Sequence, residues 1–84
     1  MWFCLVKSKT GKSFTTFGGF VSEGEAIRIG QEACIHSGGQ QYYPVEIPDK
    51  TPKDEVKGKI NYQMFEKYHI QLEDIRKRHY KGGL

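Results

Sequence analysis

The first strongly apolar stretch of the chain, residues 2–8, predicts a β-strand. Its two alternating sets of side chains are both apolar, with Trp2, Cys4 and Val6 on one side and Phe3 and Leu5 on the other. A strand that is apolar on both faces usually lies in the middle of its sheet and is covered on both sides. We therefore expect this strand to be central.

A second strand is expected over residues 13–17, after turn chemistry at Thr10-Gly11. It is rich in Thr and Phe and is more polar than the first strand, which suits the edge of a sheet. Ser22 and Glu25 then have the Ser-x-x-Glu spacing of a capping box, so a helix should begin after Ser22. Val21 is placed to form a hydrophobic staple with the first turn of that helix.

The helix should end near His36 or Ser37, because Gly38-Gly39 provides a stop. Small side chains on one of its faces would let the helix axis approach a sheet closely. That face consists of Ala26, Ile29, Gly30, Ala33 and Cys34, with Ile27 beside it. The pattern indicates a helix packed on one face of the sheet.

Residues 41–47 predict a third strand, in which Tyr43, Val45 and Ile47 alternate with more polar positions. Pro44 cannot donate a ladder hydrogen bond, so this strand should also lie at an edge. A right-handed crossover through the helix brings it beside the first strand. Residues 1–47 are thus expected to form a ββαβ core with a three-stranded antiparallel sheet in the order 2-1-3.

The remaining chain is interpreted as a polar strap over residues 48–60 and a C-terminal helix over residues 61–81. The strap contains Pro48, Pro52 and Gly58 among many charges, and Asn61 is expected to be the N-cap of the helix. Apolar side chains at helical spacing would form one stripe, made of Phe65, Tyr68, Leu72, Ile75 and His79. The 84 residues are then a single α+β domain of β-β-α-β-α order.

The net charge of +3 is unevenly distributed along the chain. Residues 1–48 balance four Lys and Arg against four Glu, and the excess collects near the end, at Arg76, Lys77, Arg78, His79, Tyr80 and Lys81. Such a basic end suits phosphates or an acidic protein surface. It equally suits the simpler role of complementing the dipole of a helix C-terminus.

Cysteine content and hydropathy predict a cytoplasmic protein. Two cysteines do not make a disulfide framework, and both fall in segments expected to be core. Lys7 and Lys9 interrupt the N-terminal apolar run, which argues against a signal peptide. Nothing approaches the ~20 apolar residues that a membrane span requires, so no membrane association is expected.

Two patterns in the sequence partly match ligand sites. The segment Thr10-Gly11-Lys12-Ser13 has Val6 where a phosphate-binding loop requires its first glycine, and its Lys-Ser pair opens a strand instead of a helix. Three residues spaced three and four apart could hold a metal on one helical side, but no further ligand pattern supports them: Glu66, His69 and Glu73. The sequence therefore predicts no cofactor and no metal.

No catalytic residues are predicted. Cys34 and His36 place a thiol and an imidazole close in sequence, but residues two apart on a helix point about 200° away from each other. The paired carboxylates, such as Glu23 with Glu25, are explained by the favourable charge of a first helical turn. We therefore expect a protein that works by contact and is not an enzyme.

The leading functional interpretation is a small protein-binding module. An edge strand with few charges invites strand addition by a partner, or by a second copy in a homodimer. The candidate contact residues are Tyr42, Tyr43, Arg76, Lys77, Arg78, Tyr80 and Lys81. In size, element order and lack of chemistry, the chain resembles the small α+β proteins with which bacteriophages block a host enzyme or defence complex. That resemblance implies an inhibitor or regulator of a host protein complex.

Nucleic-acid binding is the alternative. Lys7, Lys9, Lys12 and Thr15 would decorate the hairpin, and the basic C-terminal cluster could add phosphate contacts. Against this, the first half of the chain has no net charge, Glu46 lies on the predicted sheet, and the aromatic-rich motif of RNA-recognition domains is missing. Protein is therefore the preferred class of partner.

Overall fold

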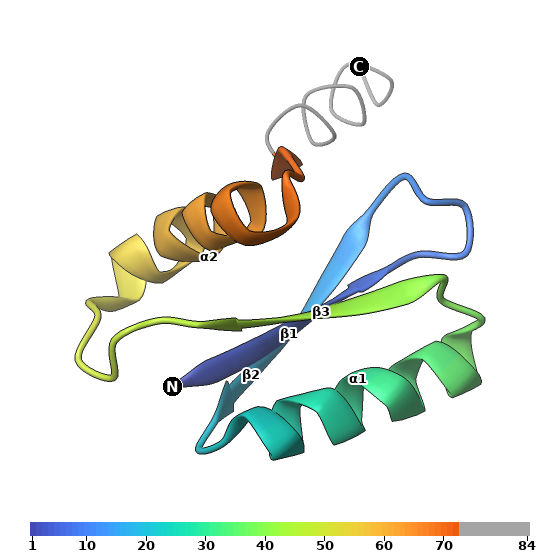
Figure 1. Ribbon diagram of the computed structural model, residues 1–84, viewed down its shortest axis with the longest axis horizontal. Coiled ribbons are helices and arrows are strands. Elements are labelled where there is room, and N and C mark those ends of the chain that lie inside the picture. The colour runs from blue at the N-terminus through green and yellow to red at the C-terminus, as the bar shows by residue number, and fades with distance from the viewer. Residues whose placement is uncertain (73–84) are drawn as a thin grey trace.

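The computed structural model describes residues 1–72, which form a three-stranded sheet with a helix on each face (Figure 1). The elements follow in the order β1 (Trp2–Lys7), β2 (Phe14–Phe20), α1 (Glu23–Ser37), β3 (Gln41–Glu46) and α2 (Lys53–Tyr68). The predicted α+β class and β-β-α-β-α order are confirmed.

β1 is the central strand, as its two apolar faces predicted. The sheet order is β2-β1-β3 and both pairings are antiparallel, with Cys4 opposite Phe17 on β2 and Pro44 on β3. Cys4 and Leu5 point to opposite faces of the sheet, yet both are buried. A helix must therefore cover each face of β1.

The N-terminal cap and C-terminal stop of α1 lie where the sequence placed them. The Ser22 Oγ accepts a hydrogen bond from the Glu25 backbone N–H at 3.3 Å. Gly38 adopts a left-handed conformation with φ 72°, and its N–H donates to the Cys34 carbonyl at 3.0 Å. The expected staple is wrong, because the Val21 side chain is 91% exposed.

Small residues bring α1 close to the sheet. Ala26 and Gly30 are buried at the contact, and a Cβ added to Gly30 would overlap the Cys4 Sγ. This face of the sheet also carries Tyr42, whose Cβ would lie 3.0 Å from the same added atom. The close approach explains why a glycine stands in the middle of a helix despite its low helix propensity.

The second helix differs from the expectation, since α2 begins at Lys53 and not at Asn61. The predicted strap of residues 48–60 is reduced to a short connection before Lys53. Pro52 precedes the helix with φ −57°, a value that suits entry into a helix, and Asp54 and Glu55 add favourable charge to the first turn. The proline and charges that suggested a strap are therefore helix-start signals.

α2 also ends earlier than expected. His69 takes a left-handed conformation, with φ 60°, and its N–H donates to the Phe65 carbonyl at 2.8 Å. The predicted stripe is therefore not continuous: Phe65 is 47% exposed, whereas Leu72 lies beyond the break and is buried. Ile75 and His79 lie outside the described residues.

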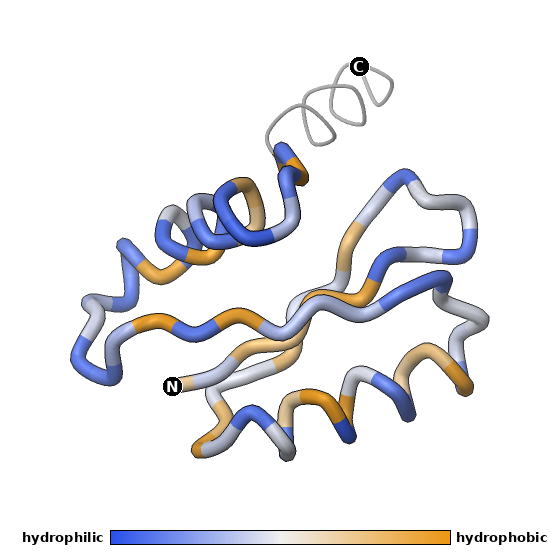
Figure 2. Tube along the Cα trace, in the orientation of Figure 1, coloured by the Kyte–Doolittle hydropathy of each residue, from blue (hydrophilic) through white to orange (hydrophobic). Residues whose placement is uncertain are grey.

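A single apolar cluster joins β1, β3 and α2. Its buried members are Leu5, Tyr43, Val45, Ile47, Ile60, Met64 and Leu72. Figure 2 shows apolar positions of α2 on the side of the helix that faces the sheet, with hydrophilic positions on the outer side. Neither helix described in residues 1–72 has the length and hydropathy needed to cross a bilayer.

Candidate protein-binding edge

The two edges of the sheet differ in the backbone groups that point outward, away from β1. Met1 and Ile47 exchange hydrogen bonds, with N···O distances of 2.8 and 3.0 Å. Hydrogen-bonded and non-hydrogen-bonded pairs alternate along an antiparallel ladder. Tyr43 and Val45 therefore bond to β1, and the backbone groups of Tyr42, Pro44 and Glu46 point away from the sheet.

The outer edge of β3 is blocked at its centre. Pro44 occupies an outward position and has no N–H to offer. Its carbonyl oxygen accepts hydrogen bonds from the Tyr68 Oη at 2.6 Å and the Lys67 Nζ at 3.3 Å. An incoming strand would find neither a donor nor a free acceptor at this residue.

The outer edge of β2 has no such protection. The Ser8 N–H donates to the Ser13 carbonyl at 2.9 Å, which marks this facing pair as hydrogen-bonded. By the same alternation, Thr15 and Phe17 bond to β1, and Phe14, Thr16 and Gly18 direct their backbone groups outward. Among residues 1–72, no other segment pairs with this edge.

The sequence of β2 also lacks charged residues and proline, two of the usual defences of an edge strand. Residues 14–20, Phe-Thr-Thr-Phe-Gly-Gly-Phe, contain no charged residue and no proline. Natural edges are commonly protected by lysine, proline, shortness or a bulge. The register shift between Trp2 and Phe3 leaves Gly19 unpaired, so a bulge limits the regular part of the edge to residues 14–18.

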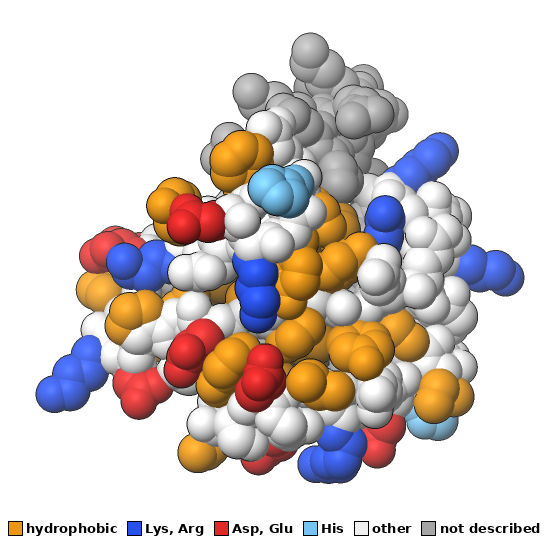
Figure 3. Space-filling view, viewed as in Figure 1, with side chains coloured by type: hydrophobic (Ala, Val, Ile, Leu, Met, Phe, Trp, Pro, Cys, Tyr) orange, Lys and Arg blue, Asp and Glu red, His pale blue; other side chains and the backbone are white. Residues whose placement is uncertain are grey.

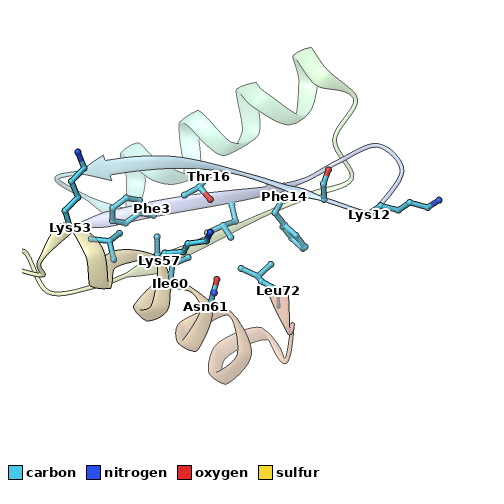
Figure 4. A pocket seen from close by; sticks show the side chains of 12 residues that line it. Phe3, Lys12, Phe14, Thr16, Lys53, Lys57, Ile60, Asn61 and Leu72 are labelled. Atoms are coloured by element: carbon cyan, nitrogen blue, oxygen red, sulfur yellow. The ribbon is translucent and has the colours of Figure 1, made fainter. Parts of the chain in front are cut away.

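A groove borders β2 on the α2 side of the sheet (Figure 4). We call it the lysine groove; its volume is about 430 Å³, and it is lined by Phe3, Leu5, Lys12, Ser13, Phe14, Thr16, Lys53, Val56, Lys57, Ile60, Asn61 and Leu72. Figure 4 shows the Phe14 ring directed from the sheet toward the side of α2, with the Phe3 ring at the other end of the groove. The groove exists because α2 packs mainly against β3, whereas α1 spans all three strands.

A second hollow borders β2 on the α1 side of the sheet. Thr15 and Phe17 line it together with residues of α1, among them Ile29, Glu32 and His36, and its volume is about 500 Å³. The open edge of β2 is therefore flanked by a hollow on each face of the sheet. A strand added at this edge would have space for its side chains on both sides.

The two predicted contact residues that the structure describes, Tyr42 and Tyr43, lie on opposite faces of the sheet. Tyr43 is 8% exposed and lies between the rings of Phe14 and Tyr68, with centroid distances of 6.0 and 4.9 Å. Tyr42 lies on the opposite face, and its hydroxyl accepts a hydrogen bond from the Gln31 Nε2 at 3.1 Å. The remaining candidates lie outside the described residues: Arg76, Lys77, Arg78, Tyr80 and Lys81.

The described part of the chain places the Cys4 thiol in the core and His69 just beyond the last residue of α2. Burial raises the pKa of the Cys4 thiol, so this core thiol is disfavoured as a thiolate nucleophile. In the metal hypothesis, His69 lies past the end of α2, and Glu73 falls outside the described residues. Across residues 1–72, no three His, Cys, Asp or Glu side chains come together as a metal site.

Cationic side chains are dispersed on the face shown in Figure 3. Apolar side chains gather across its middle, whereas Lys and Arg side chains mostly project separately from its margins. A continuous basic surface is the usual footprint of a nucleic-acid-binding domain. This face therefore does not resemble one.

No protein-family model matches the chain, and searches of curated proteins and of solved structures give no significant match.

The sequence did not predict the contribution of α2 to the site, because Lys53 and Lys57 fall within the range expected to be a polar strap. The signal was present: Val56, Ile60, Met64 and Tyr68 recur every fourth residue, which is typical of one face of a helix.

Proposed function

We propose that this protein is a non-enzymatic binding module that accepts a strand of a partner protein along β2. The observation that carries the proposal is the contrast between the two sheet edges. β3 is blocked by Pro44 and by the side chains of Lys67 and Tyr68, whereas β2 offers outward backbone groups without a charge or a proline.

Strand addition suits a protein of this size. Main-chain hydrogen bonds supply affinity, and hollows for alternate side chains supply specificity. β2 provides both, with outward groups at Phe14, Thr16 and Gly18 and a hollow on each face. A small cytoplasmic protein that captures a strand in this way would act as an inhibitor or regulator of a protein complex.

The placement of the nucleophilic groups supports a role through contact. Cys4 is buried beneath α1, and this burial raises the pKa of its thiol. Cys34 is half-buried on the face of α1 toward the sheet. A reactive cysteine needs a thiolate and access to substrate. Cys4 meets neither requirement.

The test compares Thr16→Pro with Thr16→Val. The Thr16 N–H points outward, so proline at this position removes no hydrogen bond to β1, whereas valine keeps the N–H and the β-branched shape. Both variants should retain the circular dichroism of the parent. In capture from nuclease-treated lysate of the native host cell, Thr16→Val should retain partner proteins and Thr16→Pro should lose them. Equal capture by the two variants would rule out strand addition at β2.

Nucleic acid is the second candidate, favoured by the Lys9 and Lys12 side chains exposed in the hairpin loop. It predicts capture that disappears after nuclease treatment and that falls steeply with salt. Strand addition at this edge predicts nuclease resistance and a weaker dependence on salt than contacts to many phosphates. Capture of nucleic acid by Thr16→Pro and Thr16→Val alike would favour this second candidate.

A further inference from the structure

We infer that the strand bound along β2 is acidic and presents an apolar side chain between two carboxylates to the lysine groove. This inference rests on the proposed function, because it names the chemistry of the partner at that same edge. Three features of the groove support this inference. Its floor is apolar, lysine side chains lie at both ends and in the middle, and the distribution of these lysines matches the side-chain spacing of an extended chain.

The floor of the groove is apolar and comes from all the elements around it. Phe3 and Leu5 of β1, Phe14 of β2 and Ile60 of α2 contribute to it. The Phe3 ring lies over Gly18, where an added Cβ would overlap the ring atoms. The two phenylalanines are only half-buried, so a side chain entering the groove would remove further apolar surface from water.

The charges around this floor are all positive. Lys12 approaches from the hairpin loop, and Lys53 and Lys57 lie one turn apart on α2. Figure 4 shows Lys53 toward the Phe3 end, Lys12 toward the Phe14 end and Lys57 between them. No acidic side chain is among the lining residues, and within residues 1–72 none of the three lysines forms a salt bridge.

The geometry of an added strand matches this distribution of charge. Side chains on one face of a strand recur every second residue, about 6.6 Å apart, so three of them span about 13 Å. A Glu-x-Ile-x-Glu segment would place its apolar residue over the Phe3 and Phe14 floor, with a carboxylate toward each end. The two intervening side chains would face the hollow lined by Thr15 and Phe17.

Charge disfavours the two occupants that the protein itself could supply. Residues 73–84 contain four Lys and Arg against two acidic residues, so this segment brings net positive charge to a positive groove. A second copy carries a net charge of +3 and the same three lysines. An acidic strand from another protein is the complementary partner.

The experiment uses the full chain and three acetylated, amidated heptapeptides. The acidic probe is Thr-Glu-Thr-Ile-Thr-Glu-Thr, and its two relatives carry Gln or Lys in place of both Glu residues. Calorimetric titrations should rank their affinities in the order acidic, neutral, basic. An acidic probe whose Kd exceeds about 1 mM, or equal affinities for the three peptides, would overturn the inference.

Two pairs of lysine substitutions test whether the lysines of the groove recognise the charge of the peptide. Lys53→Gln with Lys57→Gln should weaken binding of the acidic probe by roughly 2- to 30-fold, as expected for the loss of two exposed ion pairs. The control, Lys50→Gln with Lys59→Gln, changes the net charge equally at lysines that do not line the groove. The control variant should bind the acidic probe within about twofold of the parent affinity. If both pairs of substitutions weaken binding equally, the effect comes from net charge and not from the groove, and the inference is overturned.

Further arms separate failure of the inference from failure of the proposed function. If Thr16→Pro abolishes capture of partner proteins but peptide charge has no effect, the edge is used and the inference alone is wrong. A parent that sediments as a dimer while Thr16→Pro is a monomer identifies a second copy as the occupant. Binding of decanoate or oligo-dT that depends on Lys53 and Lys57, with no peptide binding, identifies a lipid or a nucleic acid. The dimer outcome and the lipid or nucleic-acid outcome both overturn the inference.

Discussion

Tyr43 shows how a single side chain can look like a contact residue in the sequence and serve the core in the fold. Its ring lies against Phe14 and Tyr68, and its hydroxyl donates to the Gln41 Oε1 at 2.8 Å. Alternation along β3 decides this role, because Tyr42 and Tyr43 must point to opposite faces. The sequence supplies the alternation, but it does not show which of the two faces α2 covers.

The raised pKa of the Tyr43 hydroxyl should make the free energy of unfolding fall at alkaline pH. Burial, and to a lesser degree the charge of Tyr68, raises the pKa of Tyr43 above its ordinary value. The unfolded chain then releases this proton first, so the contribution to stability is complete below about pH 10 and falls as the pH rises toward the folded pKa. Tyr43→Phe should remove this part of the alkaline decline. Urea unfolding at neutral and alkaline pH measures it, and identical pH profiles would contradict the assignment.

Gly30 and Gly24 form a matched pair on α1 that separates packing from helix propensity. Gly30→Ala should destabilise the fold by about 1–3 kcal/mol, because the new Cβ would overlap the Cys4 Sγ. At Gly24 an added Cβ meets nothing within 4 Å, so Gly24→Ala should stabilise by up to about 1 kcal/mol. Thermal unfolding of both variants checks the prediction. Stabilisation by Gly30→Ala would mean that α1 lies farther from the sheet.

At the scale of elements, the sequence predicted the parts that are governed by local signals. The two apolar faces of β1, the Ser22 cap and Pro44 in β3 each follow from a few neighbouring residues, and together they determine the strand order. α2 was misplaced because its start signals, Pro52 and the charges that follow, also describe a loop. The lysine groove could not be predicted, because it combines side chains from a loop, two strands and α2 that meet only after folding.

Adjacent residues of α2 provide a test of its position on the sheet. Met64 is fully buried in the apolar cluster, whereas Phe65 is about half exposed and is not part of the cluster. Met64→Ala should therefore cost about 2–5 kcal/mol through a lost core contact and a cavity. Phe65→Ala should cost less than about 1 kcal/mol. Denaturant unfolding compares the two, and the reverse ranking would restore the stripe predicted from the sequence, in which Phe65 faces the core.

At the scale of the whole molecule, the two helices cover the sheet to different extents. α1 covers all three strands through small residues, and α2 packs mainly against β3 and binds the Pro44 carbonyl. The displacement of α2 toward β3 closes that edge and uncovers the sheet surface beside β2. The protected edge and the open groove thus have one structural cause.

This asymmetry predicts a pattern of amide hydrogen exchange along β2. In the free protein, the outward N–H groups of Thr16 and Gly18 should exchange much faster than those of Thr15 and Phe17, which are hydrogen-bonded to β1. A strand added at this edge should slow Thr16 and Gly18 selectively and leave the outward amides of β3 unchanged. Amide exchange measured by nuclear magnetic resonance, with and without the acidic heptapeptide, resolves these positions. Protection that appears at Tyr42 and Glu46 instead would place the partner on β3, where Pro44 and the side chains of α2 should exclude it.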